Sequence, residues 1–288
     1  MTTTPAAPTP VAPSRPSERT AEEEGTDMLN ATARTEIAAS LRAARAEVRS
    51  ITAPSKEWDG LDVESAIEIQ KENVAHAVAA GDRVVGYKLG NIAEAMQSAF
   101  GLNRPDYGHL LAGTFRYERT TVDRTDYVAP YVELEPAFVL GRDLQGPNVT
   151  VADVITAVDH CLPAIEIIDS RCENWEITLP DTLADNGSTG SVILGGRPRR
   201  LDQLAVDELE GTVLSDGVEV ARGSTSAILG NPLSAVAFVC NTLSGYGIGF
   251  HAGDVVLAGS CLAAVPMEKA GQWAGHFAGW GSVEFEVR

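Results

Sequence analysis

The chain of 288 residues has few basic side chains, no long apolar run and only four cysteines. No apolar run approaches the ~20 residues that a membrane-spanning helix needs, which argues against a membrane protein. With 22 Lys and Arg against 40 Asp and Glu, the net charge of −18 argues against a nucleic-acid partner, because such a partner requires a basic surface. The cysteines show no paired spacing for a metal, so we expect reduced, mostly buried thiols of a cytoplasmic protein.

The first 27 residues contain almost no large apolar side chains and are rich in Pro, Thr, Ala, Ser and Glu. Such a segment cannot bury enough surface to offset the entropy lost on ordering. It also lacks the basic start and apolar core of a secretory signal. We therefore expect a disordered tail over residues 1–27, with Met28 as an alternative start.

The rest of the chain divides into a helical region, residues 28–82, and a strand-rich region, residues 83–288, which contains the candidate catalytic residues described below. Apolar residues recur at three- and four-residue intervals over about 30–50, and Asp62 precedes a second helical segment, 63–80, as its N-cap. The later region shows many short strands, few helices and frequent Gly turns. This pattern favours a β-rich α+β domain over a repeating βαβ order.

An alternating strand, Tyr131–Leu140, organises the chemistry of the chain. Glu133 and Glu135 share one face of it, because side chains two apart in a strand point the same way. Glu166 has a similar apolar setting in segment 164–169, and the three carboxylates converge if the two strands are neighbours. Carboxylates this close repel one another and raise each other's pKa unless a cation lies between them. A hard divalent ion such as Mg²⁺ takes oxygen ligands. The alternative is an ordinary one-sided sheet with Glu on its solvated face.

Two single residues and one loop offer further chemistry. Lys88 lies in the apolar stretch 84–90 between two glycines, and it is a nucleophile or acid–base group if burial lowers its pKa. The alternative is a lysine that reaches solvent from a strand edge. Asp106 follows a proline, where an ordinary turn is the alternative to a catalytic role. Residues 179–190 form a long polar loop, which is uncommon in a compact domain unless it has a function.

Five segments occur in a recognisable order: GYKLG at 86–90, PDYG at 105–108, VELEPAFVL at 132–140, PAIEIIDSR at 163–171 and DTLADN at 181–186. From about Asn30 to the C-terminus, the chain resembles the 2-hydroxypenta-2,4-dienoate hydratase and 4-oxalocrotonate decarboxylase family of the fumarylacetoacetate hydrolase superfamily. The resemblance implies a β-rich mixed roll like the C-terminal domain of fumarylacetoacetase, with an N-terminal helical part. It also implies bound Mg²⁺ or Mn²⁺ and a cytoplasmic homo-oligomer, with a paired hydratase or decarboxylase as a further partner.

The resemblance also assigns roles to individual side chains. The three metal-binding carboxylates of the family fall on Glu133, Glu135 and Glu166. Its catalytic lysine, the acid of its Pro-Asp segment and a serine of its polar loop fall on Lys88, Asp106 and Ser188. Ser188 would hold substrate or water.

The implied activity is a metal-dependent hydratase that adds water to a small molecule, a 2-hydroxy-2,4-dienoate, and gives a 4-hydroxy-2-oxo acid. We expect Lys88 and Asp106 to move a proton between the 2-hydroxyl and the carbon chain, with the pKa of Lys88 nearer neutrality than that of a free lysine, ~10.4. A 2-oxo-acid decarboxylase on the same site is the alternative, because the same enolate chemistry releases carbon dioxide from a suitably placed carboxylate. A catalytically idle partner subunit is a third interpretation.

Three departures from the family pattern leave the identity of the substrate open. Asn91-Ile92, Gly187 and Gly271-Gln272 stand where Leu-Thr, Ala and Gly-Asp are usual, and we expect these departures close to the site. Three other residues near the motifs either shape the pocket or serve in packing: His109, His160 and Trp175.

Overall fold

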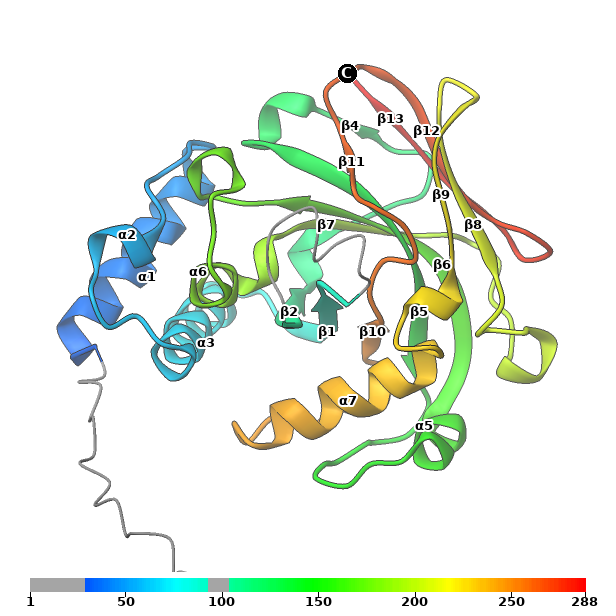
Figure 1. Ribbon diagram of the computed structural model, residues 1–288, viewed down its shortest axis with the longest axis horizontal. Coiled ribbons are helices and arrows are strands. Elements are labelled where there is room, and N and C mark those ends of the chain that lie inside the picture. The colour runs from blue at the N-terminus through cyan, green and yellow to red at the C-terminus, as the bar shows by residue number, and fades with distance from the viewer. Residues whose placement is uncertain (1–28, 93–103) are drawn as a thin grey trace, which may run out of the picture.

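The computed structural model describes residues 29–92 and 104–288, so the tail predicted over residues 1–27 lies outside the described residues. Within those ranges the chain forms an α+β fold, in which N-terminal helices stand beside two β-sheets (Figure 1). The division at residues 82 and 83 stays a prediction.

Three helices precede the first strand: α1 Ala31–Ala46, α2 Pro54–Glu57 and α3 Val63–Ala79. Side-chain caps start the two long ones, since Asn30 accepts a hydrogen bond from Ala33 N (2.9 Å) and Asp62 accepts one from Ser65 N (2.7 Å). Helices α1 and α3 pack against each other, and each buries one apolar face. The α1–α3 pair lies beside the larger sheet (Figure 1).

The larger sheet contains eight strands: β1 Val84–Gly90, β2 Asp106–Leu111, β3 Phe115–Arg116, β5 Pro130–Leu140, β6 Val158–Asp169, β7 Thr189–Leu194, β10 Val255–Leu257 and β11 Val265–Pro266. Their order is β2-β1-β10-β5-β6-β7-β3, and β11 also pairs with β5. The β1–β10 and β3–β7 pairs are parallel and the other pairs are antiparallel. The sheet is therefore mixed, and its two longest strands, β5 and β6, are neighbours at its centre.

The smaller sheet has the order β4-β13-β12-β8-β9. Its strands are β4 Thr121–Val122, β8 Glu210–Ser215, β9 Val218–Ser224, β12 Gly271–Phe277 and β13 Gly281–Val287. It packs closely on β5 and β6, because a Cβ on Gly275 would lie 2.6 Å from Leu134 Cδ1 and 3.2 Å from Ile165 Cγ1. This contact covers one face of the β5–β6 pair, and the site lies on the other.

The remaining helices lie around the sheets: α5 Val151–Ala157, α6 Leu179–Ala184 and α7 Pro232–Ser244. Short 3₁₀ turns occupy 112–114, 124–126, 173–175, 186–188, 201–203 and 225–227. Helix α6 corrects a prediction, because residues 179–190 are not one long loop. A reciprocal capping box between Thr178 and Asp181 starts a helix there.

One segment in the described part of the chain, Thr225–Ser244, is long and apolar enough to count as a candidate membrane span, although the sequence analysis did not identify it. Half of it is buried, and α7 packs against α5 and β1 as a core helix does (Figure 1). The four cysteines are buried and free, as expected. Burial raises the pKa of Cys161 to about 12, so this thiol is poorly reactive.

Candidate active site

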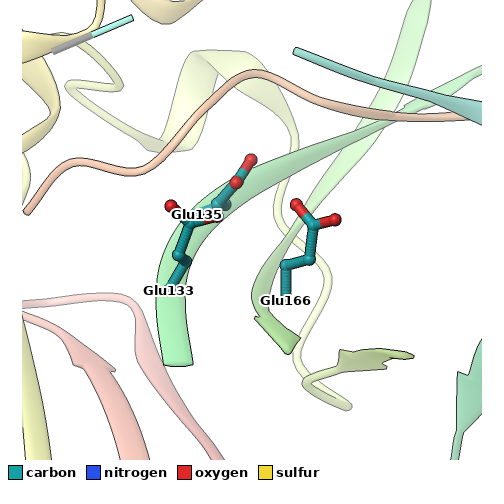
Figure 2. A group of neighbouring side chains, drawn as sticks. All are labelled: Glu133, Glu135 and Glu166. Atoms are coloured by element: carbon teal, nitrogen blue, oxygen red, sulfur yellow. The ribbon is translucent and has the colours of Figure 1, made fainter. Parts of the chain in front are cut away.

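Three glutamates meet on the face of β5 and β6 that the smaller sheet does not cover. Glu133 of β5 lies directly opposite Glu166 of β6, and Glu135 follows two residues later on the same face. Figure 2 shows the three carboxyl groups gathered in one space between the strands. One oxygen of each lies within 4.8 Å of the others, and the side chains are between 0% and 3% exposed. The convergence expected from the strand pattern is therefore present.

The glutamate cluster lacks partners for much of its charge. Glu135 accepts one hydrogen bond from Gly259 N (2.8 Å), but its other oxygen and both oxygens of Glu166 accept none from the described residues. Burial raises the pKa of all three carboxyl groups, to about 8 for Glu133, and the charge of Glu166 adds to the rise in Glu133 and Glu135. Buried oxygen donors without protein partners fit a hard divalent cation.

Lys88 and Asp106 form a buried ion pair beside this cluster. Lys88 lies on β1 and Asp106 is the first residue of β2, so Asp106 belongs to a strand and not to a turn. Lys88 Nζ is 3.1 Å from Asp106 Oδ1. Burial lowers the pKa of Lys88, but the charges of Asp106 and the three glutamates outweigh burial and raise it above its ordinary value. The expectation of a lysine nearer neutrality is therefore wrong for the protein without a bound cation.

Two glycines allow the backbone to enclose this ion pair. A Cβ on Gly90 would lie 2.4 Å from Asp106 Oδ1 and 2.7 Å from Lys88 Nζ. A Cβ on Gly187 would lie 2.5 Å from Lys88 Cε, and Gly187 also has a positive φ of 63°. Gly187, one of the three departures, therefore touches the site.

Thr182 of α6 connects the ion pair to Ser188. Its Oγ1 donates to Asp106 Oδ2 (3.3 Å) and lies 3.4 Å from Ser188 Oγ. The four side chains therefore form a continuous polar series from amine to carboxylate to two hydroxyls. Thr182 lies in the DTLADN segment but was not among the residues predicted from the sequence, because a loop was expected there.

Hydrogen bonds to the neighbouring strand hold the turn that carries Ser188. Asn186 accepts from His109 N (2.8 Å) and donates to His109 O (2.9 Å). Asp185 binds Arg171 through a buried pair, with Oδ1 2.5 Å from Nε and Oδ2 3.0 Å from the Arg171 backbone N. These contacts stabilise three consecutive positive φ values, at residues 186–188, which would otherwise be strained.

A pocket joins these groups, and it is lined by Lys88, Gly90, Asn91, Asp106, Glu133, Ile168, Trp175, Ile177, Thr182, Gly187 and Ser188. Trp175 is thus a wall residue. His109 is buried between α3 and β2, where its Nδ1 donates to Gln70 Oε1 (3.0 Å), and His160 pairs with Asp159 (2.8 Å). Neither histidine lines the pocket.

The third departure lies away from the pocket, contrary to expectation. Gly271 and Gln272 belong to β12 of the smaller sheet, where Gln272 N donates to Asp216 Oδ1 (2.9 Å). Their place in the smaller sheet means that they form no part of the pocket wall. Of the three departures, those at Asn91 and Gly187 are the ones that line the pocket.

No protein-family model matches the chain. Curated relatives do. The TodF product hydratase of Pseudomonas putida is 40% identical over 222 residues, which cover 77% of this chain and 83% of the relative. The 2-keto-4-pentenoate hydratase of Burkholderia vietnamiensis is 38% identical, and the 2-oxo-hept-4-ene-1,7-dioate hydratase of Escherichia coli is 34% identical. Each alignment covers 86% of this chain, with 94% and 95% of the respective relative.

Solved structures share the fold. The 4-oxalocrotonate decarboxylase from Pseudomonas putida G7, complexed with magnesium and adipate, has a TM-score of 0.87 and 30% identity, and the match covers 91% of this chain and 99% of that chain. The fumarylpyruvate hydrolase from Pseudomonas aeruginosa, in complex with Mn²⁺ and pyruvate, has a TM-score of 0.55 and 13% identity over 70% of this chain and 88% of that chain. The second likeness concerns the fold alone.

Proposed function

This chain belongs to the 2-hydroxypenta-2,4-dienoate hydratase and 4-oxalocrotonate decarboxylase family, and we propose that it is a divalent-metal-dependent hydratase of a 2-hydroxy-2,4-dienoate. One observation carries the proposal: three buried carboxylates form a cluster beside the Lys88–Asp106 pair, and one of them, Glu133, lines the same pocket as that pair. Such a pocket combines a cation site with groups that move protons.

In the proposed reaction the proton of the 2-hydroxyl is lost and carbon 5 gains a proton, which gives a 2-oxo-3-enoate. Water then adds its oxygen to carbon 4 and a proton to carbon 3, and the product is a 4-hydroxy-2-oxo acid. Glu133, Glu135 and Glu166 would hold Mg²⁺ or Mn²⁺, and that cation would supply positive charge that stabilises negative charge on the substrate.

The remaining roles belong to the polar series beside the cluster. Lys88, whose Nζ lies 3.1 Å from Asp106 Oδ1, donates to developing negative charge on the substrate. Asp106 accepts a proton through the oxygen that Thr182 holds, and Ser188 orients substrate or water. Burial of the pair excludes bulk water, which strengthens these charge interactions.

A decarboxylase is the second candidate, because the solved 4-oxalocrotonate decarboxylase matches almost its whole length. The same groups would stabilise negative charge left after loss of carbon dioxide. The hydratase is preferred, since the curated relatives at 34–40% identity carry hydratase names. The complete set of acidic and basic groups favours an active enzyme over an idle partner subunit.

The test is turnover of 2-hydroxypenta-2,4-dienoate and of 4-oxalocrotonate, with Mg²⁺ and with chelator. We expect loss of dienoate absorbance and formation of a 4-hydroxy-2-oxo acid, abolished by chelation, with little release of carbon dioxide. The variant Lys88→Ala should lose at least 100-fold in kcat, while Lys269→Ala, at an exposed site, keeps it. Carbon dioxide release without hydration would replace the hydratase by the decarboxylase.

We further propose that the protein is a cytoplasmic homo-oligomer and that residues 83–288 form the mixed roll of fumarylacetoacetase-like proteins. Ile155 on α5 and Phe238 on α7 are exposed on helices that pack together, and a subunit contact would cover such apolar side chains. Light scattering on the eluting protein tests the assembly. A monomer at micromolar concentration contradicts it.

A further inference from the structure

The pocket has a charged end and an apolar end. Lys88, Asp106 and Glu133 belong to the first, and Ile168, Trp175 and Ile177 belong to the second. Ile168 follows Glu166 by two residues on β6, so both side chains lie on the same face. At about 3.3 Å per strand residue, their Cα atoms are ~7 Å apart. That separation is comparable with the distance from the chelating end of a dienoate to its far substituent.

The backbone is strained where it forms the apolar end. Asn174 and Trp175 have φ of 56° and 57°, which non-glycine residues rarely adopt in succession. The indole is held in place by a hydrogen bond from Nε1 to Ala129 O (2.9 Å) and by an edge-on contact with Tyr131, with ring centroids 5.3 Å apart. Because Nε1 donates to the backbone, the indole presents an apolar surface to the pocket.

In the part of the chain that the structure describes, the apolar end offers no cation to a second carboxylate. Among the described residues that line the pocket, Lys88 is the one cation, and it already faces Asp106. Lys56, near this end in the fold, is engaged by Glu176. The sequence of residues 93–103 contains no Lys, Arg or His, and Arg104 is exposed and does not line the pocket. Burying an unpaired carboxylate is strongly unfavourable.

We infer that Ile168, Trp175 and Ile177 form a specificity wall that selects dienoates whose far end is hydrogen or alkyl and rejects those that end in a carboxylate. This inference rests on the proposed function and deepens it, because it names the substrate class of the same site. The substrates are then monocarboxylic 2-hydroxy-2,4-dienoates.

The first experiment compares kcat/KM of the Mg²⁺-loaded wild-type protein for 2-hydroxypenta-2,4-dienoate, 2-hydroxyhexa-2,4-dienoate and 2-hydroxyhepta-2,4-diene-1,7-dioate. We expect the two monocarboxylates to exceed the dicarboxylate at least 100-fold. Values within threefold of one another, or a preference for the dicarboxylate, overturn the inference and leave the hydratase assignment standing.

The second experiment places a cation in the wall. Ile177→Lys should raise the ratio of dicarboxylate to monocarboxylate kcat/KM at least tenfold, because the new ammonium pairs with the second carboxylate. Val218→Lys, at an exposed β-branched residue of β9 in the smaller sheet, is the matched control and should leave the ratio unchanged. An unchanged ratio in a folded Ile177→Lys protein argues against the wall.

A binding measurement separates this inference from the proposed function. Quenching of tryptophan fluorescence reports binding of 2-oxopentanoate and 2-oxohexanedioate to the Mg²⁺-loaded protein without turnover. We expect at least 30-fold tighter binding of the monocarboxylate. If no dienoate is hydrated, the proposed function fails, and this comparison still decides whether the far end of the pocket is apolar. Equal affinities overturn the inference.

Discussion

At the scale of single residues, one hydroxyl group couples the two acid–base candidates. Thr182 Oγ1 donates to Asp106 Oδ2 and neighbours Ser188 Oγ, so it determines which carboxylate oxygen faces away from Lys88. Thr182 is 2% exposed, and solvent therefore provides no substitute donor.

Thr182→Val removes this hydroxyl with almost no change in volume. We expect kcat to fall about 10- to 100-fold with a smaller effect on KM, because the reacting groups are misplaced while the pocket keeps its shape. Thr182→Ser should restore most of the rate. Thr225→Val is the matched control, since Thr225 is also buried and bonds the backbone at Leu209. Steady-state rates with 2-hydroxypenta-2,4-dienoate test this expectation, and a wild-type kcat in Thr182→Val would contradict the coupling of Asp106 and Ser188 through Thr182.

Gly187 tests whether space beside Lys88 matters for activity. Gly187→Ala places a Cβ 2.5 Å from Lys88 Cε at a φ of 63°, whereas Gly217→Ala places one at a φ of 75° with nothing within 4 Å. Both variants should lose about 1 kcal/mol of unfolding free energy through the backbone. Because Ala is usual at position 187 in the family, both variants should keep kcat within threefold of the wild type, since the flexible end of Lys88 can shift to make room for the Cβ. Urea unfolding and kinetics on both proteins test this, and a tenfold loss of kcat in Gly187→Ala alone would show that the space beside Lys88 limits activity.

The glutamate cluster was predictable at this scale because a strand has a period of two. Alternation alone places Glu133 and Glu135 on one face, and a neighbouring strand with Glu166 completes the cluster. Thr182 was not predictable, because its contact with Asp106 joins α6 to β2 across 76 positions of sequence. Local pattern contains no information about that contact.

At the scale of elements, strand β2 and helix α3 are joined by a buried amide–imidazole contact. Gln70 of α3 accepts from His109 Nδ1, and its amide donates to Tyr107 O (3.0 Å) and Leu183 O (2.7 Å). This single side chain therefore connects α3, β2 and α6 behind the pocket.

Acid should weaken this contact. Burial lowers the pKa of His109 from 6.5 to about 4. The charge of Lys71 acts in the same direction by a smaller amount, and a hydrogen bond with Asn186 opposes the shift. Between pH 6.5 and 4 the unfolded chain binds this proton and the folded chain does not, so falling pH favours unfolding. The contribution amounts to about 3 kcal/mol at 1.36 kcal/mol per pKa unit.

The measurement compares the urea stability of wild type and His109→Gln across that range. Other acid-sensitive groups affect both proteins alike, so the difference in slope reports His109 even if the variant is less stable overall. His160→Gln serves as the control, because the His160 side chain is partly exposed at the start of β6 and pairs with Asp159. Parallel pH curves for wild type and His109→Gln would contradict the assignment.

Several elements were predictable because their signals are local. The Asp62 cap and the apolar strand at 84–90 both appear where the sequence indicates. Helix α6 was missed because its polar residues suggested a loop. Asp181 explains the difference, since it is completely buried and accepts from Ser55 and Thr178 as well as capping the helix. Its partner Ser55 is far away in sequence.

At the scale of the whole molecule, the β5–β6 pair has two different faces. Leu134 and Ile165 pack under the smaller sheet, while Glu133 and Glu166, one residue along each strand, face the pocket. Composition and alternation indicated a β-rich protein with an acidic strand face. They did not indicate which element covers each face of the β5–β6 pair. The glutamates are between 0% and 3% exposed although the smaller sheet covers the opposite face, and this burial gives their charge a large effect on stability.

Burial of the glutamate cluster makes the stability of the folded chain depend on a bound cation. Without a cation, three neighbouring buried carboxylates repel one another and destabilise the folded chain, so Mg²⁺ should stabilise it by relieving this repulsion. At 100 times its dissociation constant a ligand adds about 2.7 kcal/mol, which corresponds to a rise in Tm of several degrees for a chain of this size. Glu166→Gln should abolish the rise and, in chelator, should unfold at a higher temperature than the wild type, since one buried charge is gone.

Glu208→Gln, at an exposed acid, should behave as the wild type in both conditions. Thermal unfolding of the three proteins with Mg²⁺ and with chelator distinguishes the outcomes. If Glu166→Gln keeps the full Mg²⁺ shift, the cation binds elsewhere and the cluster is not its site.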